Sequence, residues 1–186
     1  MTIPDYRAVI DRFYEPGSAL RRILVSHSRS VADMALELNI KHGLGLDQHM
    51  VEVGAMLHDV GIFLCNAPSI ECRGPEHYLR HGILGAALMR SQGLPEWLAR
   101  IAERHTGSGI TADEIIAADM PLPHADFVPK TLLEKLICYA DKFYSKSGDM
   151  ARKPLDKVVT QMAKHGEKPL ERFAALHREI TGSDLD

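Results

Sequence analysis

The sequence predicts an all-α protein, a compact helical bundle, because three features recur along it. Apolar residues return every three to four positions, the period of a helix with one buried face. Residues that begin or end helices punctuate this pattern: glycines, prolines and two Thr-x-x-Glu sequences typical of capping boxes. No stretch alternates apolar and polar residues for long enough to predict a β-strand. The 186 residues, 45% of them apolar, suffice for one domain with its own core.

The first two predicted helices span residues 18–42 and 47–60. The first has one apolar stripe and a charged opposite face, and Gly43 with Gly45 ends it. Asp47 can cap the second, which is apolar on most sides. We therefore expect the second helix to be central and buried.

Two further helices are predicted over residues 76–91 and 95–105, after a loop that contains two prolines. Gly93 stops the first of them, and Pro95 stands in the first turn of the second. Capping boxes then predict a short helix over residues 111–118 and a longer one over 131–144. Their residues are Thr111 with Glu114 and Thr131 with Glu134.

Two terminal helices are predicted over residues 154–164 and 169–180. We expect a single domain over residues 1–186, with a core at about 18–146 and a C-terminal extension at about 150–182. The apolar positions of this extension predict packing against the core or against a second copy of the chain, so a homodimer is possible.

Composition limits the partners and the compartment. The net charge of −3 provides no general basic field, so we expect no binding to a nucleic-acid polymer. The three cysteines lack CxxC spacing, which suits a reducing compartment. No apolar run approaches the roughly 20 residues that a membrane span needs, and the N-terminus does not resemble a signal peptide. We therefore expect a cytoplasmic protein that does not bind membranes.

Ionisable side chains fall on the apolar stripes of five predicted helices. His27, for example, lies four residues after Ile23 and four before Val31. A buried imidazole or carboxylate is costly unless it is paired or binds a metal, so five such helices together indicate a metal site at the centre of the bundle. The residues are His27, His58 with Asp59, His81, His105 and Asp141.

The order of these residues resembles the HD superfamily of metal-dependent phosphohydrolases. The resemblance rests on His27, on the doublet His58 and Asp59 within GAMLHDVG, and on Asp141 within YADKF. It covers about residues 18–146. Many HD proteins continue the doublet as HDxGK, whereas Ile62 stands at the lysine position of this chain.

A further pair of histidines is similar to the subset of HD proteins that hold two metals. His81 lies in LRHGILGAALM and His105 lies in AERHTG. The stretches ERHTGSGIT and LLEKLICYADK resemble small single-domain HD proteins related to the bacterial diadenosine-tetraphosphate hydrolases.

The resemblance implies two divalent ions that share one carboxylate. The ligands of the first ion would be His27, His58, Asp59 and Asp141. The ligands of the second would be His81 and His105, with Asp59 bridging. Imidazole and carboxylate ligands favour iron or manganese, allow zinc, cobalt or nickel, and suit magnesium less well.

Two such ions would lower the pKa of a bridging water toward neutrality and supply a hydroxide for attack on a phosphoryl group. Asp59 would hold both ions. Lys142 directly follows the ligand Asp141. Arg104 directly precedes the ligand His105, so either cation could reach a substrate phosphate. Other candidate cations are Arg73, Arg80 and Lys135.

Some positions leave alternatives open. His77 lies one turn before His81 and could replace it as a ligand or contact the substrate. Glu103 and Asp119 could orient ligating imidazoles. We expect the remaining histidines to be solvated: His42, His49, His124, His165 and His177.

The sequence thus predicts a metal-dependent phosphohydrolase acting on a nucleotide or similar phosphorylated small molecule, with a dinucleoside polyphosphate slightly ahead of a nucleoside monophosphate. Two alternatives are a di-iron oxygenase of the HD type and a non-catalytic nucleotide-binding module.

Overall fold

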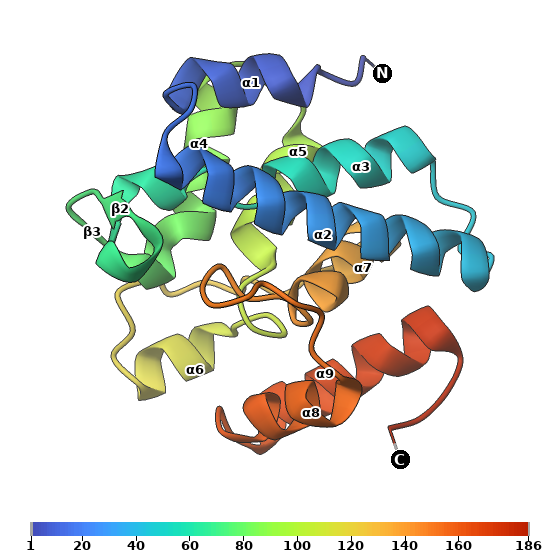
Figure 1. Cartoon of the computed structure of the whole chain (residues 1–186). Helices are drawn as coiled ribbons and strands as arrows, with labels where there is room; N and C mark the ends of the chain where they lie inside the picture. The colour runs from blue at the N-terminus through green and yellow to red at the C-terminus, as the bar shows by residue number, and fades with distance from the viewer. Residues whose placement is uncertain (1, 186) are drawn as a thin grey trace.

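The protein is described by a computed structural model that covers residues 2–185 and is predominantly helical, as predicted (Figure 1). The helices of this part of the chain are α1 (Tyr6–Phe13), α2 (Ala19–Lys41), α3 (Gln48–Leu57), α4 (His81–Ser91), α5 (Glu96–Arg104), α6 (Ala112–Ala117), α7 (Leu132–Asp141), α8 (Leu155–Ala163) and α9 (Glu167–Thr181).

Two helix pairs and helix α7 make up the bundle. Helix α2 packs along α3, and α4 packs along α5. Helix α7 contacts α2, α3 and α5, and it also contacts α9 of the C-terminal extension (Figure 1). The buried face of α3 runs from Val51 to Leu57, which confirms the prediction that this helix is central.

The structure corrects the prediction between residues 58 and 80. Helix α4 begins at His81 rather than at residue 76, because the preceding residues pair as short strands. The strands are β1 (Cys65–Ala67), β2 (Cys72–Arg73) and β3 (Glu76–His77), in the order β2-β1-β3. Between them lie three-residue 3-10 helices: η1 (Ile62–Leu64), η2 (Pro68–Ile70) and η3 (Tyr78–Arg80). Strands of two or three residues are too short to leave an alternating pattern in the sequence.

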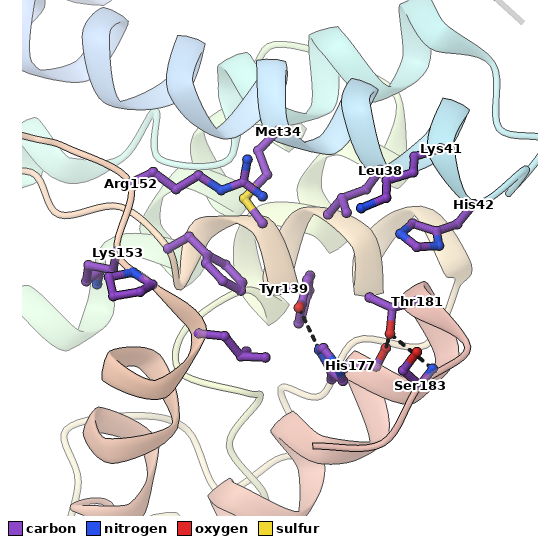
Figure 2. Close-up of a pocket in the computed structure, with 13 residues that line it drawn as sticks. Met34, Leu38, Lys41, His42, Tyr139, Arg152, Lys153, His177, Thr181 and Ser183 are labelled. Carbon is purple, nitrogen blue, oxygen red and sulfur yellow. Dashed lines mark hydrogen bonds between the residues drawn. The ribbon is translucent and has the colours of Figure 1, made fainter. Parts of the chain in front are cut away.

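Two other predictions also need correction. Helix α1 was not predicted, although Asp5 caps it by accepting a hydrogen bond from the Arg7 amide. His177, predicted to be solvated, is buried on α9. Its Nδ1 atom and the Tyr139 hydroxyl form a hydrogen bond of 2.7 Å (Figure 2). Tyr139 also stacks on Phe173, with ring centroids 5.4 Å apart, so aromatic contacts attach α9 to α7.

Helix α8 packs on α9, and the two terminal helices cover one end of the bundle (Figure 1). A pocket of about 530 Å³ lies where α8 and α9 meet α2 and α7 (Figure 2). Among residues 2–185, no helix combines the length and the apolar character that crossing a membrane requires.

Candidate metal centre

The six predicted ligands lie together inside the bundle, and we call them the ligand cluster. His58 and Asp59 lie at the C-terminal end of α3, and His105 lies at the C-terminal end of α5. His81 is the first residue of α4 and Asp141 the last of α7, whereas His27 lies within α2. All six are buried. Their potential ligand atoms form two overlapping groups, each with all atoms within 4.8 Å of one another: His27, His58, Asp59 and Asp141, and then Asp59, His81 and His105.

Asp59 divides the cluster into two halves because its two oxygens face different imidazoles. Oδ2 lies 3.2 Å from Nε2 of His27 and 3.1 Å from Nε2 of His58. Oδ1 lies 3.4 Å from Nε2 of His81 and 3.3 Å from Nε2 of His105. A carboxylate so placed can bind one cation through each oxygen.

The two halves differ in the number of side chains that they offer. Asp141 joins the first half, with Oδ1 3.0 Å from Nε2 of His27 and 3.5 Å from Nε2 of His58. In the second half, Nε2 of His81 and Nε2 of His105 lie 3.0 Å apart, and Asp59 is the carboxylate of that group. The first half therefore offers four side chains and the second three, within the described residues.

Backbone carbonyls orient three of the imidazoles. In each, Nδ1 donates to the carbonyl three residues earlier, which leaves the Nε2 lone pair directed into the cluster. The pairs are His58 with Ala55 (2.6 Å), His81 with Tyr78 (2.7 Å) and His105 with Ala102 (2.7 Å). The last carbonyls of a helix have no partner within the helix, so the ends of α3 and α5 supply free acceptors.

The sequence left open whether the carboxylates of Glu103 and Asp119 orient the ligating imidazoles. Glu103 forms ion pairs with Arg90 (2.8 Å) and Arg100 (2.7 Å) rather than with a ligating histidine. Asp119 is exposed and lies beyond α6. Neither carboxylate therefore orients a ligating imidazole, and backbone carbonyls accept from the Nδ1 atoms of His58, His81 and His105 instead.

Burial and mutual charge set the protonation of the cluster. Burial lowers the pKa of His81 to about 3 and also lowers the pKa of His105, so both imidazoles are neutral. Burial would raise the pKa of Asp59, but the charges of His58 and Lys146 outweigh it and hold that pKa well below the usual range. For Asp141 burial is likewise outweighed, chiefly by Lys142. Burial lowers the pKa of His58, but Asp59 and Asp141 outweigh it and raise that pKa to about 9. The anionic carboxylates and the neutral imidazoles of His81 and His105 are in the states that bind cations, whereas His58 has to lose a proton to become a ligand.

The polar atoms of the cluster fit a pair of divalent ions. Both oxygens of Asp59 and Nε2 of His58 are buried and make no hydrogen bond. Asp59 is 0% exposed, and burying a carboxylate costs free energy unless cations neutralise it. The Lys146 ammonium lies at Oδ2, whereas Oδ1 faces the imidazoles of His81 and His105. Nitrogen and oxygen donors without a thiolate suit first-row divalent metals.

Two lysines lie against the carboxylates of the cluster. Nζ of Lys142 lies 2.7 Å from Oδ2 of Asp141 and donates to the His105 carbonyl (3.1 Å). Nζ of Lys146 lies 2.6 Å from Oδ2 of Asp59, and its side chain is 13% exposed. Sequence reasoning missed Lys146, which follows α7 in an irregular segment. The four-residue spacing from Lys142 was the one available signal. At the lysine position of HDxGK, Ile62 is fully buried.

A cavity of about 730 Å³ opens beside the cluster, and we call it the cluster cavity. His81 and Lys142 line one part of it, together with Tyr78, whose ring stacks on His81 at a centroid distance of 4.8 Å. The loop at residues 106–110, α6 and the C-terminal helices line the rest. The second half of the cluster therefore borders a space that can hold a small molecule.

The structure distinguishes His81 from His77. His81 belongs to the cluster, whereas His77 is exposed and its Nδ1 accepts a hydrogen bond from the Leu79 amide (3.1 Å). His77 lines the cluster cavity, so contact with a substrate stays a prediction for it.

The predicted cations other than Lys142 have carboxylate partners elsewhere. Arg104 is 12% exposed, lies 3.0 Å from Glu134 and is not among the residues that line the cluster cavity. The geometry therefore favours Lys142 over Arg104 as a substrate contact. The other pairs are Arg73 with Glu71, Arg80 with Glu76 and Lys135 with Glu179.

A close helix contact positions His81. A Cβ atom at Gly61 would lie 2.4 Å from the His81 carbonyl oxygen and 2.4 Å from the Gly85 amide nitrogen. The segment after Asp59 and the first turn of α4 thus touch through their backbones. Glycine is required there because a side chain would push α4 away from the cluster.

Comparisons with known proteins agree with this arrangement. The family profile of the HD domain matches residues 24–145. An uncharacterized protein of Methanocaldococcus jannaschii is 34% identical over 84% of this chain and 87% of its own length. The crystal structure of the L. monocytogenes phosphodiesterase PgpH HD domain covers 97% of this chain, and 99% of that domain is covered in turn, with a TM-score of 0.53 and 16% identity. That structural likeness concerns the fold.

Two relatives are longer proteins. The tRNA (cytidine(56)-2'-O)-methyltransferase of Thermoplasma volcanium is 31% identical over 99% of this chain but 50% of its own length. The protein of the same name from Picrophilus torridus is 31% identical over 88% of this chain and 44% of its own length. The chain spans about half the length of these relatives.

Proposed function

Because the chain belongs to the HD-domain family, we propose that it is a metal-dependent phosphohydrolase that cleaves a phosphate ester or anhydride. The observation that carries the proposal is the position of Asp59. Its two oxygens face two separate pairs of imidazoles, and neither oxygen makes a hydrogen bond. This arrangement suits a carboxylate that bridges two divalent ions.

We propose that each half of the cluster holds one ion. The first would be held by His27, His58, Asp59 and Asp141, and the second by Asp59, His81 and His105. Divalent ions at such a site supply water activation near neutral pH and charge neutralisation on a phosphoryl oxygen. Iron or manganese is our first expectation for the native metal, given the ligand types.

The remaining residues bind and orient the substrate. Lys142 lines the cluster cavity beside His81, so its ammonium group can bind a phosphoryl oxygen next to the ligands, whereas the Lys146 ammonium is held at Asp59. The three histidines anchored on backbone carbonyls keep their orientation when a substrate enters. Tyr78 covers His81 and restricts the approach of water from that side.

The substrate that we propose is a nucleotide or a dinucleoside polyphosphate. A cavity of about 730 Å³ lies within the roughly 300–1,000 Å³ typical of small-molecule sites. The net charge of −3 supports a small anionic substrate bound by local lysines rather than a nucleic-acid polymer. The methyl transfer named for two relatives is not carried over, because this chain spans about half of their length.

A phosphate-release screen tests the proposal. Anaerobically purified protein, supplied with manganese or iron(II), is assayed on mononucleotides, dinucleotides and dinucleoside polyphosphates. We expect phosphate or nucleotide release that disappears on chelation and in Asp59→Asn, whereas Asp119→Asn, at an exposed aspartate, retains it. Turnover that requires dioxygen without phosphate release, or tight nucleotide binding without turnover under any metal, would contradict a phosphohydrolase.

A further inference from the structure

The cluster cavity has two chemically different ends. At one end lie His81 of the ligand cluster and Lys142, whose ammonium is held at Asp141. The rest of the lining is largely apolar, although Glu114, His165 and Arg172 also belong to it. Its apolar side chains come from two parts of the chain: Ile110 and Met120 on the α6 side, and Met162 and Pro169 on the C-terminal side.

The C-terminal wall of this cavity lies outside the region that defines the family. The HD profile ends at residue 145, whereas Met162 lies on α8 and Pro169 and Arg172 lie on α9. Met162 is 7% exposed, so it packs in the core and presents part of its surface to the cavity. The extension therefore does more than cover the bundle.

Polar contacts fix this wall to the opposite side of the cavity. The Arg172 guanidinium donates to both carboxylate oxygens of Glu114 (2.8 Å each) and to the Gly109 carbonyl (3.0 Å). The Ser108 hydroxyl donates to the Pro169 carbonyl (2.7 Å). Glu114 is also the capping-box residue of α6, so one carboxylate joins the start of α6 to α9.

From this geometry we propose that α8 and α9 form the recognition wall for the organic part of the substrate, with Met162 and Pro169 packing on a planar apolar group such as a nucleobase. The inference rests on the proposed function, since it places the phosphate at Lys142 and the cluster. A phosphate without an organic group would leave the apolar end of the cavity in contact with water and gain nothing from it. The wall thus selects phosphate esters that carry an aromatic group over small aliphatic ones.

The pocket in Figure 2, which Leu155 at the start of α8 lines, provides an internal control. It is lined by Met34, Leu155 and Tyr139 among others, and none of the six cluster ligands lines it. Leu155 and Met162 therefore lie on one helix but border different cavities.

The first test measures binding and does not require turnover. Zinc-loaded protein with 13C-labelled methionine methyl groups is titrated with adenosine monophosphate and, separately, with inorganic phosphate. Met162→Leu and Met34→Leu assign the two signals. We expect the Met162 methyl signal to shift to saturation with adenosine monophosphate but not with inorganic phosphate, while the Met34 signal stays unchanged. A Met162 signal that does not respond to the nucleotide, or one that responds equally to phosphate, would contradict the proposed recognition wall.

The second test measures specificity. Met162→Ala should lower kcat/KM for adenosine monophosphate about tenfold and leave kcat/KM for glycerol phosphate within about twofold. Leu155→Ala should leave both values within about twofold. Equal losses on both substrates in Met162→Ala would contradict recognition by this wall. If no phosphate ester is cleaved, the proposed function fails, whereas the methionine titration still decides whether the wall binds the nucleotide.

Discussion

The helical bundle and the C-terminal helices contribute to the site in different ways. The bundle supplies all six cluster residues, and helix ends with their free carbonyls fix three of the imidazoles. Helices α8 and α9 supply no cluster residue and instead give an apolar surface, tied to α6 through Arg172. Under the proposed function, reaction chemistry and substrate recognition come from separate parts of one chain.

Replacing Asp59 should have the largest effect, because it should remove the contribution of the bundle to activity. Asp59→Asn removes the charge that both halves share, and several kcal/mol of transition-state stabilisation depend on the ions, so we expect a loss of at least about 10³-fold in kcat/KM. Metal content, measured by elemental analysis, should fall well below that of the wild type. Normal metal content and activity in this variant would show that Asp59 does not bridge ions.

Variants of Lys142 and Arg104 distinguish a residue that contacts the substrate from one that only forms a structural ion pair. A charge-assisted hydrogen bond contributes about 1.5–3 kcal/mol, so Lys142→Met should lower kcat/KM roughly 10- to 100-fold with unchanged metal content. Arg104→Met should leave kcat/KM of the folded protein unchanged and lower the free energy of unfolding, because the Glu134 carboxylate loses its ion pair and keeps only the hydrogen bond from the Lys130 amide. The opposite pattern in the two variants would assign the substrate contact to Arg104.

Gly61→Ala tests whether the close contact with α4 maintains the second half of the cluster. Its Cβ would meet backbone atoms of His81 and Gly85, and overpacking of this kind costs typically about 1–3 kcal/mol. We expect a matching loss in the free energy of unfolding from urea titration, and weaker binding of the second ion. Gly54→Ala is the control, because its nearest neighbours are flexible side-chain ends, such as Ile101 Cδ1 at 2.8 Å. An equal effect of both changes on the second ion would refute a positioning role of Gly61.

The Glu114–Arg172 pair should give the smallest effect, confined to acid pH. Burial raises the pKa of Glu114, but hydrogen bonds from Arg172 and Thr111 outweigh it and lower the pKa below the usual 4.5. A lowered folded-state pKa stabilises the fold above pH 4.5, and this contribution is lost as the pH falls below that value. Glu114→Gln should therefore reduce stability by about 1 kcal/mol or less near pH 7 and flatten its decline in acid. Thermal unfolding between pH 7 and pH 3 measures this, and parallel curves for the two proteins would contradict the pairing.

The helices and the convergence of the ligand cluster could be predicted because both produce a regular spacing of residues in the sequence. His27 and Asp141 are 114 residues apart, yet each lies on the apolar face of a helix, where a polar side chain stands out. Their packing into one centre needed the resemblance as well as the periodicity.

Other parts of the site could not be read from the sequence. Lys146 lies in an irregular segment without periodicity, and the carbonyls that anchor His58 and His105 belong to the backbone, which every residue shares. Met162 and Pro169 have no reactive group, so the recognition wall looked like ordinary core. His177, by contrast, was misjudged although it lies four residues after Phe173 and three before Ile180, on the buried face of α9 where it contacts Tyr139.

Metal stoichiometry tests the central claim most directly. Protein purified without oxygen and reconstituted with manganese or iron(II) is analysed for bound metal per chain, in the wild type and in His81→Ala. Two tightly bound ions in the wild type and one in the variant are the predicted result. Substoichiometric metal in the wild type, or an unchanged count in His81→Ala, would contradict a centre in which Asp59 joins two ions.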